Sequence, residues 1–518
     1  MPYDYKPFDY VAPPGLSAPE ARHKVIIVGA GPIGLAAAIE LSNHGVGSVV
    51  LDDNNVVSVG SRAICWSKRS LEILDRLGVG ESCVQKGVTW KVGRTHHGAR
   101  EVFNFDLLPE GGHKMPAFVN LQQYYVEEYL AAQAQANPLI DLRFKNKVTG
   151  LQQKPDCTQI EIETPDGAYS LEAEYLLACD GARSAIRTMM GLDFEGVLFE
   201  ERFLIADIVM QSDFPSERWF WFEPEFHAGQ SALLHKQPDN IYRIDLQLGW
   251  EADPEQERKP ERIIPRIEKA LGRSDFTLDW TSIYTFQCRR LEKFVHDRVI
   301  FVGDSAHVVS PFGARGGNGG LQDVDALGWR LAAIVKGEGG PALLERYDLE
   351  RTYGSDENIA NSSRTTRFMS PRAGAERVFR DAVLALSEHA GFARPMVNSG
   401  RLSVPCTYPL TDAPDCEAMP RATRPGSVAQ DAPLGNDWLM SRLAGRFCLL
   451  AIGTQAPDIA GLQAVELDIT PELRTRYLGQ AGQGLYLIRP DQVVAARWEQ
   501  ANAQSIATHY AAIREGRA

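Results

Sequence analysis

A chain of 518 residues, 44% of them hydrophobic, can bury more than one core, so two or three domains are expected. The formal net charge of −13 and the lack of a dense Lys/Arg run argue against a nucleic-acid partner and favour a small molecule. The eight cysteines form no Cys-x-x-Cys pair, so neither a metal site nor a disulfide framework is expected. No apolar run is long enough to span a membrane, which predicts a cytoplasmic protein with no membrane partner.

The first informative motif is a glycine-rich turn between a predicted strand and a predicted helix. A β-branched run at residues 25–28 and an alanine-rich helical pattern at residues 35–41 flank Gly29, Gly31 and Gly34. In this context the first glycine permits a tight turn, the second lets the backbone approach a pyrophosphate, and the third lets the helix pack close to the sheet. The helix N-terminus would offer N–H groups to the phosphates. A glycine-rich turn of any α/β protein is the other interpretation.

An acidic pair favours the dinucleotide interpretation. The next predicted strand, SVVLD, ends at Asp52, eighteen residues after Gly34, and Asp53 follows it. A carboxylate at the end of this strand accepts hydrogen bonds from a ribose. Either aspartate fits this role, and the motif does not choose between NAD and FAD.

Two later segments also end apolar strands in an Asp–Gly or Gly–Asp pair. YLLACDGARSAIR, at residues 175–187, contains Asp180, and RVIFVGDSAH, at residues 298–307, contains Asp304. The second segment continues into SPFGARGGNGG, and a helical pattern follows that we expect to begin near Leu321. A backbone with so few side chains cannot pack through them, so another group must lie against it.

These three segments, GAGPIG, CDGARSAIR and GDSAHVVSPFGARGGNGG, resemble in order the fingerprints of the single-component flavoprotein aromatic hydroxylases, the class of para-hydroxybenzoate hydroxylase. The resemblance covers about residues 23–370. It implies an FAD enzyme with NADPH or NADH as a transient electron donor. It also implies that O2 is used to hydroxylate a phenolic or other activated aromatic small molecule through a flavin hydroperoxide.

The resemblance also implies which residues contact FAD. Asp304 would hold the ribityl chain, and the peptide 311–318 would touch the edge of the isoalloxazine ring. Asp180 would lie between the FAD site and the nicotinamide route, while Arg62 and Gln123 would reach the cofactor from a loop and a helix. The residues implied in this way are Arg62, Gln123, Asp180, Asp304, Pro311, Gly316, Gly317 and Asn318.

Short strands with turns occupy residues 194–290, which predicts an antiparallel sheet. In the resembling family such a sheet covers the substrate pocket. Alternation in IYRIDLQL places Arg243, Asp245 and Gln247 on one face, where His235 of the partner strand can join them. His235, Arg243 and Asp245 are therefore the catalytic candidates. The other interpretation is a solvated sheet face, which is common for alternating polar residues.

The C-terminal part follows a segment rich in Pro, Ser and Asp and alternates strands with helices. Its last stretch, LYLIRPDQVVAARW, resembles the final hairpin of a thioredoxin-like domain, with Pro490 and Asp491 at the turn. Cys406, Cys416 and Cys448 lack the spacing for redox chemistry, so we expect a structural or dimer-associated domain, and a homodimer is one expected state. This domain and the SRAIC segment resemble most the 3-(3-hydroxyphenyl)propionate and polyketide hydroxylases.

The whole pattern predicts an α/β fold: a Rossmann-like FAD-binding domain with an inserted antiparallel substrate-binding sheet, followed by a C-terminal thioredoxin-like α/β domain. A halogenase or dehydrogenase of the same fold and a catalytically silent FAD-binding protein are alternatives, although the halogenase segment Trp-x-Trp-x-Ile-Pro is absent. The predicted segments are an arm (1–22), the FAD-binding domain in two parts (23–193 and 291–400), the substrate-binding sheet (194–290), a linker (401–425) and a thioredoxin-like domain without redox cysteines (426–518).

Overall fold

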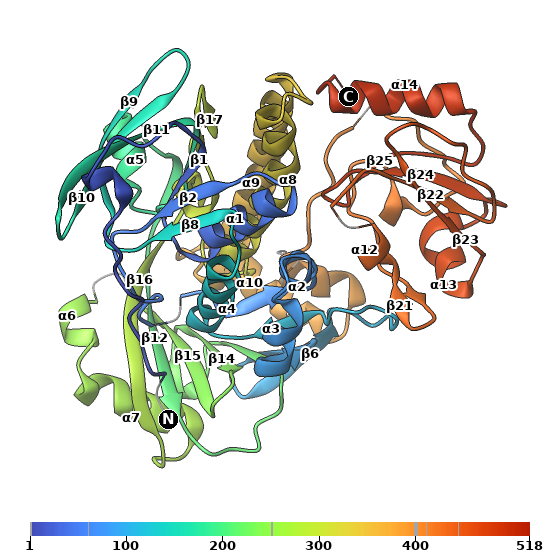
Figure 1. The fold of residues 1–518 in the computed structure, drawn as a ribbon. Coiled ribbons are helices and arrows are strands. Elements are labelled where there is room, and N and C mark those ends of the chain that lie inside the picture. Colours follow the sequence, from blue (N-terminus) through green and yellow to red (C-terminus); the bar gives the residue numbers. More distant parts are fainter. Residues whose placement is uncertain are drawn as a thin grey trace.

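The structure is a computed structural model (Figure 1). It describes residues 3–60, 62–249, 252–397, 402–410, 412–443 and 445–517. The described strands include two eight-stranded sheets and a four-stranded C-terminal sheet, with helices packed around them. This arrangement confirms the predicted α/β class. Among the described residues, no helix combines the length and apolar character needed to cross a membrane.

The first eight-stranded sheet carries the glycine-rich turn. Strand β1 lies between β2 and β11 and runs parallel to both, and its four residues from Val25 to Val28 are buried. Buried, β-branched central strands are typical of a parallel sheet covered on both faces, so the predicted Rossmann-like core is confirmed. The strands of this sheet are β1 (His23–Val28), β2 (Ser48–Leu51), β8 (Ile140–Arg143), β9 (Lys147–Gln153), β10 (Thr158–Thr164), β11 (Gly167–Ala178), β17 (Val295–His296) and β18 (Val299–Phe301).

Two helices pack closely against each other beside this sheet. Helices α1 (Pro32–Asn43) and α8 (Gly316–Val335) approach so closely that a Cβ atom at Gly320 would lie 2.7 Å from the Ile33 side chain. The predicted start of α8 near Leu321 was wrong, because the helix begins five residues earlier. Glycine usually disfavours helix by about 1 kcal/mol, but at Gly320 it allows close packing, because a Cβ atom there would also lie 3.2 Å from Cα of Gly303.

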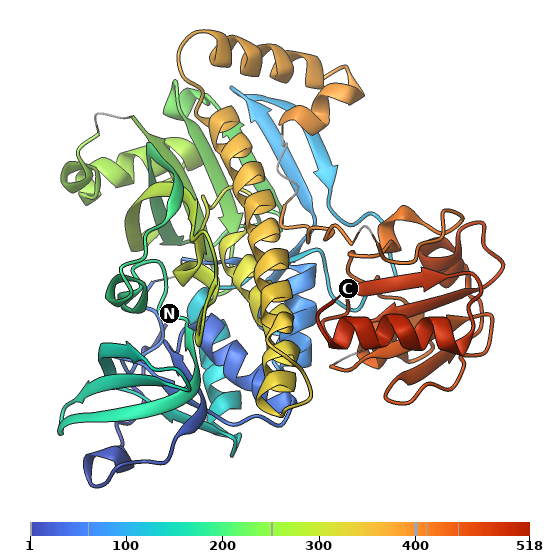
Figure 2. The same ribbon diagram turned by 90° about the horizontal axis from the view of Figure 1, so that it is seen from above.

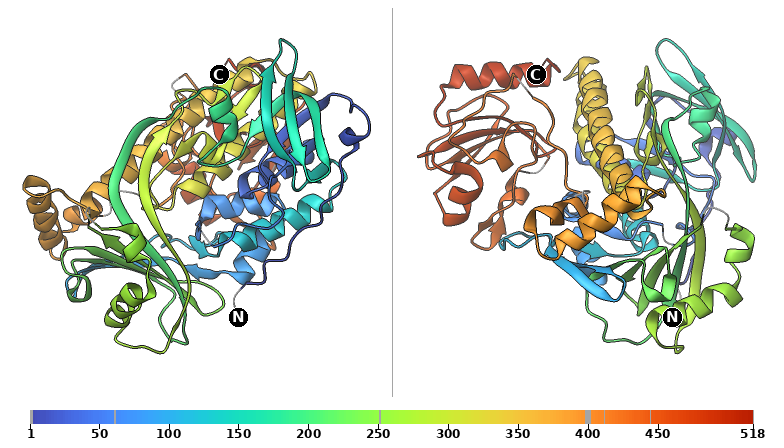
Figure 3. Two further views of the ribbon diagram at one scale, coloured as in Figure 1. Left: turned by 90° about the vertical axis from the view of Figure 1, so that its left-hand side faces the viewer. Right: turned by 180° about the vertical axis from the view of Figure 1, so that it is seen from behind.

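The second sheet is the predicted substrate-side sheet, and its long strands arch away from the first sheet (Figure 3). The prediction of antiparallel strands within residues 194–290 is confirmed. It was incomplete, because a short strand at residues 307–308 and two strands from residues 92–106 extend the sheet, and one of the latter two pairs in parallel with the strand at residues 218–222. The strands in spatial order are β19 (His307–Val308), β16 (Thr277–Arg290), β12 (Glu195–Val209), β15 (Ile241–Leu248), β14 (Ser231–Lys236), β13 (Arg218–Phe222), β5 (Val92–His97) and β6 (Arg100–Asp106).

Both faces of the central strands of this sheet are covered. One face, with Leu246 and Ile244, packs on Ile263 and Ile267 of helix α7 (Pro260–Leu271). The opposite face carries Arg243, which is 2% exposed. The solvated-face interpretation of the alternating polar residues is therefore wrong.

Helices and a smaller sheet complete the molecule. Helix α9 (Ala342–Met369) runs between the large sheets and the C-terminal domain (Figure 2), and α10 (Ala375–Ser387) follows it. In the C-terminal sheet, β22 and β23 are parallel while β24 and β25 form the predicted antiparallel hairpin. This is the strand arrangement expected for a thioredoxin-like domain. Its elements are β22 (Cys448–Ile452), β23 (Gln463–Leu467), β24 (Gly484–Ile488), β25 (Val494–Trp498) and α14 (Ala503–Arg514).

Candidate active site

The turn between β1 and α1 shows why three glycines are needed. Gly29 has a φ of +106°, and a Cβ atom there would lie 2.5 Å from the carbonyl oxygen of Cys179. A Cβ atom on Gly34 would lie 1.9 Å from the carbonyl oxygen of Gly29, so the helix packs directly on the turn. A Cβ atom on Gly31, in contrast, would meet nothing within 4 Å. The space beside Gly31 is open at a helix N-terminus, as a pyrophosphate requires.

Of the two candidate ribose ligands, Asp52 lies at this turn. Its carboxylate accepts hydrogen bonds from the N–H groups of Ala30 (2.6 Å) and Asn54 (2.8 Å). Burial raises the pKa of Asp52, while these two hydrogen bonds oppose the rise. Asp53 is exposed and forms no side-chain hydrogen bond within the described ranges. The geometry therefore favours Asp52.

Asp304 lies in a recess in the sense that water reaches its side chain although protein surrounds it on most sides. It belongs to a short 3-10 turn, Gly303–Ser305, and its side chain is accessible to water. Desolvation nevertheless raises the pKa of Asp304, because protein surrounds the group on most sides. The positive charge of Arg62 and the neighbouring His307 oppose this rise but do not cancel it. Among the described residues the carboxylate has no hydrogen-bond or ion-pair partner. An accessible carboxylate with unused acceptors fits a ligand rich in hydroxyl groups.

The loop that carries Arg62 lies near Asp304, because the positive charge of Arg62 acts to lower the pKa of this carboxyl. Gln123, the first residue of helix α4 (Gln123–Gln135), accepts a hydrogen bond from the N–H of Ala63 (3.1 Å) and donates one to Glu127 (2.7 Å). These bonds fix the loop on the helix. The structure thus brings Arg62 and Asp304 together. Gln123 holds the loop that carries Arg62 through its hydrogen bond with Ala63.

The predicted ring-contacting peptide is anchored at one end and open at the other. The amide of Asn318 donates to the carbonyl oxygens of Cys65 (2.9 Å) and Ala314 (2.6 Å), so it is used inside the protein. Pro311 is exposed. A Cβ atom on Gly316 would lie 4.0 Å from Oδ1 of Asp304, which places this glycine beside the same recess. A Cβ atom on Gly317 would lie 3.3 Å from the Trp66 ring.

Asp180 follows the end of β11. Its Oδ2 accepts a hydrogen bond from the N–H of Ile186 (3.0 Å), while its Oδ1 is buried without a hydrogen-bond partner. Burial raises its pKa. A buried acceptor without a partner is costly for a protein alone, so a donor from a ligand or water suits this position.

Four polar residues form a row across the buried face of the second sheet. Asp207, Arg243, His235 and Arg218 occupy neighbouring positions on β12, β15, β14 and β13. Arg243 donates two hydrogen bonds to the carboxylate of Asp207, each 2.8 Å long. Arg243 also donates a hydrogen bond of 3.3 Å to the carbonyl oxygen of Arg62. The charge of Arg243 is therefore neutralised within the sheet, and its side chain joins the sheet to the cofactor loop.

His235 is neutral in this environment. It is 3% exposed, and burial together with the positive charges of Arg218 and Arg243 lowers its pKa well below 6.5. Its Nδ1 lies 4.0 Å from the sulfur of Cys65. It can accept or donate a hydrogen bond but carries no charge at neutral pH.

Asp245 is the one member of the predicted catalytic set whose protonation changes near neutrality. Burial raises its pKa to about 6, and Asp207 adds to that effect, while Arg243 and Arg218 oppose it. Its Oδ1 is buried and lacks a hydrogen-bond partner. An acid of this pKa can take up a proton under ordinary conditions.

Arg218 is a candidate that the sequence prediction missed. Its guanidinium is half-buried, and within the described part of the chain it forms no hydrogen bond or ion pair. Desolvation lowers its pKa, an effect that Cys65 and Asp245 oppose. It is directly opposite His235 in the β13–β14 pairing. A partly desolvated, unpaired guanidinium is a suitable partner for an anionic oxygen.

A cavity of about 430 Å³ opens beside this region and is large enough for a small aromatic molecule. Trp90 lines it, and the Trp90 indole donates a hydrogen bond to Asn120 (2.7 Å), which also lies 3.2 Å from Cys65. Cys65 is in turn the neighbour of His235, so side-chain contacts connect the cavity wall to the polar row, although no residue of the row lines the cavity itself.

Comparison with known proteins agrees with this site. The chain matches the family described as FAD binding domain over residues 22–362. A 3-(3-hydroxy-phenyl)propionate/3-hydroxycinnamic acid hydroxylase of Mycolicibacterium smegmatis is 26% identical over 361 residues, covering 70% of this chain and 64% of that protein. A flavin-dependent monooxygenase of Mycobacteroides abscessus is 29% identical over 498 residues, covering 92% of this chain and 97% of that protein.

A solved structure, the flavin-dependent monooxygenase PieE in complex with FAD and substrate, shares the fold with a TM-score of 0.78 at 19% identity, covering 96% of this chain and 99% of that one. The matched family region includes the glycine-rich turn, Asp304 and the loop before α8. The open space at Gly31 and the free carboxylate of Asp304 fit the diphosphate and the hydroxyl-rich chain of FAD. The resemblance to the flavoprotein hydroxylases is confirmed: the chain belongs to the FAD binding domain family, and FAD is its cofactor.

Proposed function

We propose that this protein is an NAD(P)H- and O2-consuming monooxygenase that hydroxylates a phenolic small molecule. The observation that carries the proposal is the position of Arg243, which ties the buried polar row of the substrate-side sheet to the carbonyl oxygen of Arg62 in the cofactor loop. The polar row thus faces the cofactor site rather than solvent. FAD bound there supplies electron transfer from NAD(P)H and the activation of O2.

Different residues would hold different parts of FAD. The turn with Gly31 and Asp52 would bind the pyrophosphate and ribose, and Asp304 would accept hydrogen bonds from the ribityl hydroxyls. Arg62 and the peptide from Pro311 to Gly317 would lie beside the ring system. Asp180, whose Oδ1 has no partner, would border the approach of the nicotinamide. We also propose the domain limits predicted from the sequence and a homodimeric state.

The substrate oxygen would lie between Arg218 and Asp245. Asp245 would accept the phenolic proton, and the positive charge of Arg218 would stabilise the phenolate that forms. Loss of the proton raises the electron density of the ring and favours attack by an electrophilic oxygen. His235, neutral and buried, would orient the same oxygen by a hydrogen bond. Burial of Asp207, Arg243 and His235 would keep water away from this side of the reaction.

The pKa of Asp245 predicts a specific pH dependence. As pH rises through about 6, Asp245 becomes ionised and able to accept the proton, so kcat/KM should rise through the same range. The Asp245→Asn variant keeps the side-chain shape but cannot ionise, so it should lose this limb of the pH profile. The measurement is kcat/KM between pH 5 and 8 for the wild-type protein and the variant.

The His235→Gln variant is the control for this prediction, because His235 stays neutral over the same range. It should keep the limb near pH 6 even if its rate falls. A limb that persists in Asp245→Asn would assign the titration to another group.

The proposed function itself can be tested with the FAD-loaded protein and a panel of phenols. At least one phenol should accelerate NADH or NADPH oxidation and yield a product heavier by one oxygen atom, labelled when isotopically enriched O2 is supplied. If no phenol stimulates NAD(P)H oxidation, the protein is an FAD-binding protein without this activity. A product that forms only with halide would identify a halogenase instead.

A further inference from the structure

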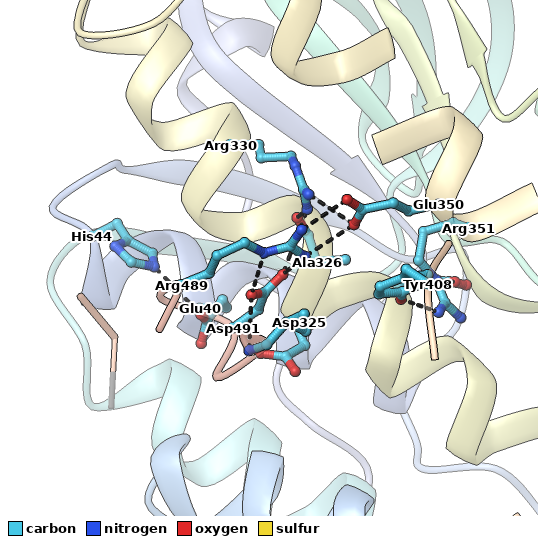
Figure 4. Close-up of polar contacts among 12 residues, drawn as sticks. Glu40, His44, Asp325, Ala326, Arg330, Glu350, Arg351, Tyr408, Arg489 and Asp491 are labelled. Atoms are coloured by element: carbon cyan, nitrogen blue, oxygen red, sulfur yellow. Dashed lines mark hydrogen bonds and ion pairs between the residues drawn. The ribbon is translucent and has the colours of Figure 1, made fainter. Parts of the chain in front are cut away.

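The C-terminal domain docks on the FAD-binding domain through buried charges (Figure 4). Arg489, at the end of β24, donates two hydrogen bonds to Glu350 of α9, at 2.7 and 2.9 Å, and pairs with Asp491. Arg330 of α8 donates to the same Glu350 at 2.8 Å. All four side chains are at most 5% exposed. Because breaking one member of a buried ion pair is costly, such a cluster fixes the position of the β24–β25 turn on the two helices.

A second connection starts at Tyr408, in the segment before the C-terminal domain. Its backbone N–H donates to the carbonyl oxygen of Gly426 (2.9 Å), and the N–H of Gly426 donates to that of Val494 in β25 (2.8 Å). The ring of Tyr408 also lies 5.9 Å from the guanidinium of Arg489. Tyr408 is therefore attached to the C-terminal sheet by its backbone and to the charge cluster by its ring.

The hydroxyl of Tyr408 reaches into the FAD-binding domain. It accepts a hydrogen bond of 2.8 Å from Nη1 of Arg351 on α9. Arg351 is fully buried, and its Nε donates to Oδ1 of Asp323 on α8 (2.6 Å), while its Nη2 contacts the carbonyl oxygen of Gly319 (3.3 Å). Arg351 thus holds the first part of α8, whose first turn includes the end of the predicted ring-contacting peptide.

Asp323 completes the path to the cofactor site. Its Oδ2 accepts hydrogen bonds from the backbone N–H of Gly303 (3.0 Å) and from Nε2 of His307 (2.6 Å). Gly303 directly precedes Asp304, whose carboxylate faces the recess. An unbroken series of hydrogen bonds therefore runs from β25 through Tyr408, Arg351 and Asp323 to the turn that presents Asp304.

We propose that Tyr408 and Arg351 are positioning residues through which the C-terminal domain fixes the FAD-binding turn and the start of α8. The proposal rests on the role of Asp304 in FAD binding. The C-terminal domain then contributes to the geometry of the flavin site without touching the flavin. Each member of the series is buried. Water does not compete for these hydrogen bonds, and each bond strengthens its neighbours.

The Tyr408→Phe variant tests this proposal because it removes only the hydroxyl that Arg351 uses. Without this acceptor, the Arg351 guanidinium can shift and loosen the Gly303–Asp304 turn. We expect FAD to leave the variant about tenfold faster than the wild-type protein, as for the loss of one buried hydrogen bond. The measurement is the rise in flavin fluorescence after dilution of the FAD-loaded protein, together with the visible spectrum of the bound flavin.

A matched control lies in the same domain. The hydroxyl of Tyr477 is also buried and donates to the carbonyl oxygen of Gln430, but it has no link to Arg351. Tyr477→Phe should lower the thermal stability of the protein and leave FAD release at the wild-type rate. If both variants release FAD equally fast, general loosening of the domain explains the effect and the proposal fails.

The Arg351→Lys variant gives an independent test, because lysine keeps the charge beside Asp323 but cannot contact Asp323, Gly319 and Tyr408 together. Its FAD release should be accelerated at least as much as that of Tyr408→Phe. Wild-type release rates in both variants would overturn the proposal. The measurement requires no substrate, so a protein that holds FAD but hydroxylates no phenol would contradict the proposed function and leave this inference standing.

Discussion

The Asp304→Ala variant should fold normally and lose its FAD on dialysis. The wild-type carboxylate is accessible from the recess and has no partner among the described residues, so its acceptors are available for the ribityl hydroxyls. Loss of hydrogen bonds to a charged group costs roughly 1.5–3 kcal/mol, or about 10- to 150-fold in the FAD dissociation constant. Titration of the apoprotein with FAD, followed by flavin fluorescence, measures this change.

Two controls separate a cofactor effect from a folding effect. The pKa of Asp304 is raised in the folded protein, so its ionised form opposes folding at neutral pH, and its removal should not lower the thermal stability of the apoprotein. The Asp53→Ala variant removes an exposed carboxylate near the ribose end and should retain stoichiometric FAD. Retention of stoichiometric FAD by Asp304→Ala would show that this residue does not hold the cofactor.

The parts of the site that could be predicted from the sequence are those whose chemistry lies in consecutive residues. Gly29 and Gly34 are needed where a strand, a turn and a helix follow one another, and the pattern of their neighbours identifies all three elements. The same local signals predicted the wrong start of α8, because they do not include the close packing of Gly320 on Ile33 and Gly303. A glycine in a close helix contact has the same sequence signature as a glycine in a loop.

The register between distant strands could not be predicted. Arg243 and Asp207 are 36 residues apart in sequence, and only the pairing of β12 with β15 makes them an ion pair. Arg218 precedes four aromatic residues and has no local signal, but the pairing of β13 with β14 places it opposite His235. Alternation identifies which residues share a face of one strand. The function of that face depends on the residues that the neighbouring strands place beside it.

This register changes what is expected of Arg243. The sequence predicts a catalytic residue on the sheet that covers the substrate pocket, and removal of a side chain that contacts only the substrate would leave stability unchanged. In the structure its removal leaves Asp207 buried, 3% exposed and without its counter-charge. Arg243→Ala should therefore lower the free energy of unfolding by about 3–5 kcal/mol, measured by denaturant titration. An unchanged free energy of unfolding would contradict this assignment.

Arg218→Ala should have the opposite pattern: unchanged stability and FAD content with a large loss of activity. Arg218 has no protein partner within the described part of the chain, so its removal leaves no protein group unpaired. If it stabilises the substrate phenolate, its loss should reduce kcat/KM by about 10- to 150-fold, corresponding to one charge-assisted hydrogen bond of roughly 1.5–3 kcal/mol.

The pKa of a bound phenol distinguishes this role from a general effect on the pocket. A phenol whose anion absorbs visible light should titrate at a lower pH on the wild-type protein than in solution, because the positive charge of Arg218 favours the anion. The bound phenol should return towards its solution pKa in Arg218→Ala and stay low in Arg218→Lys, which keeps the charge. If all three proteins bind the phenol with the same pKa, the guanidinium does not face the substrate oxygen, and the anion site must be sought elsewhere on the sheet.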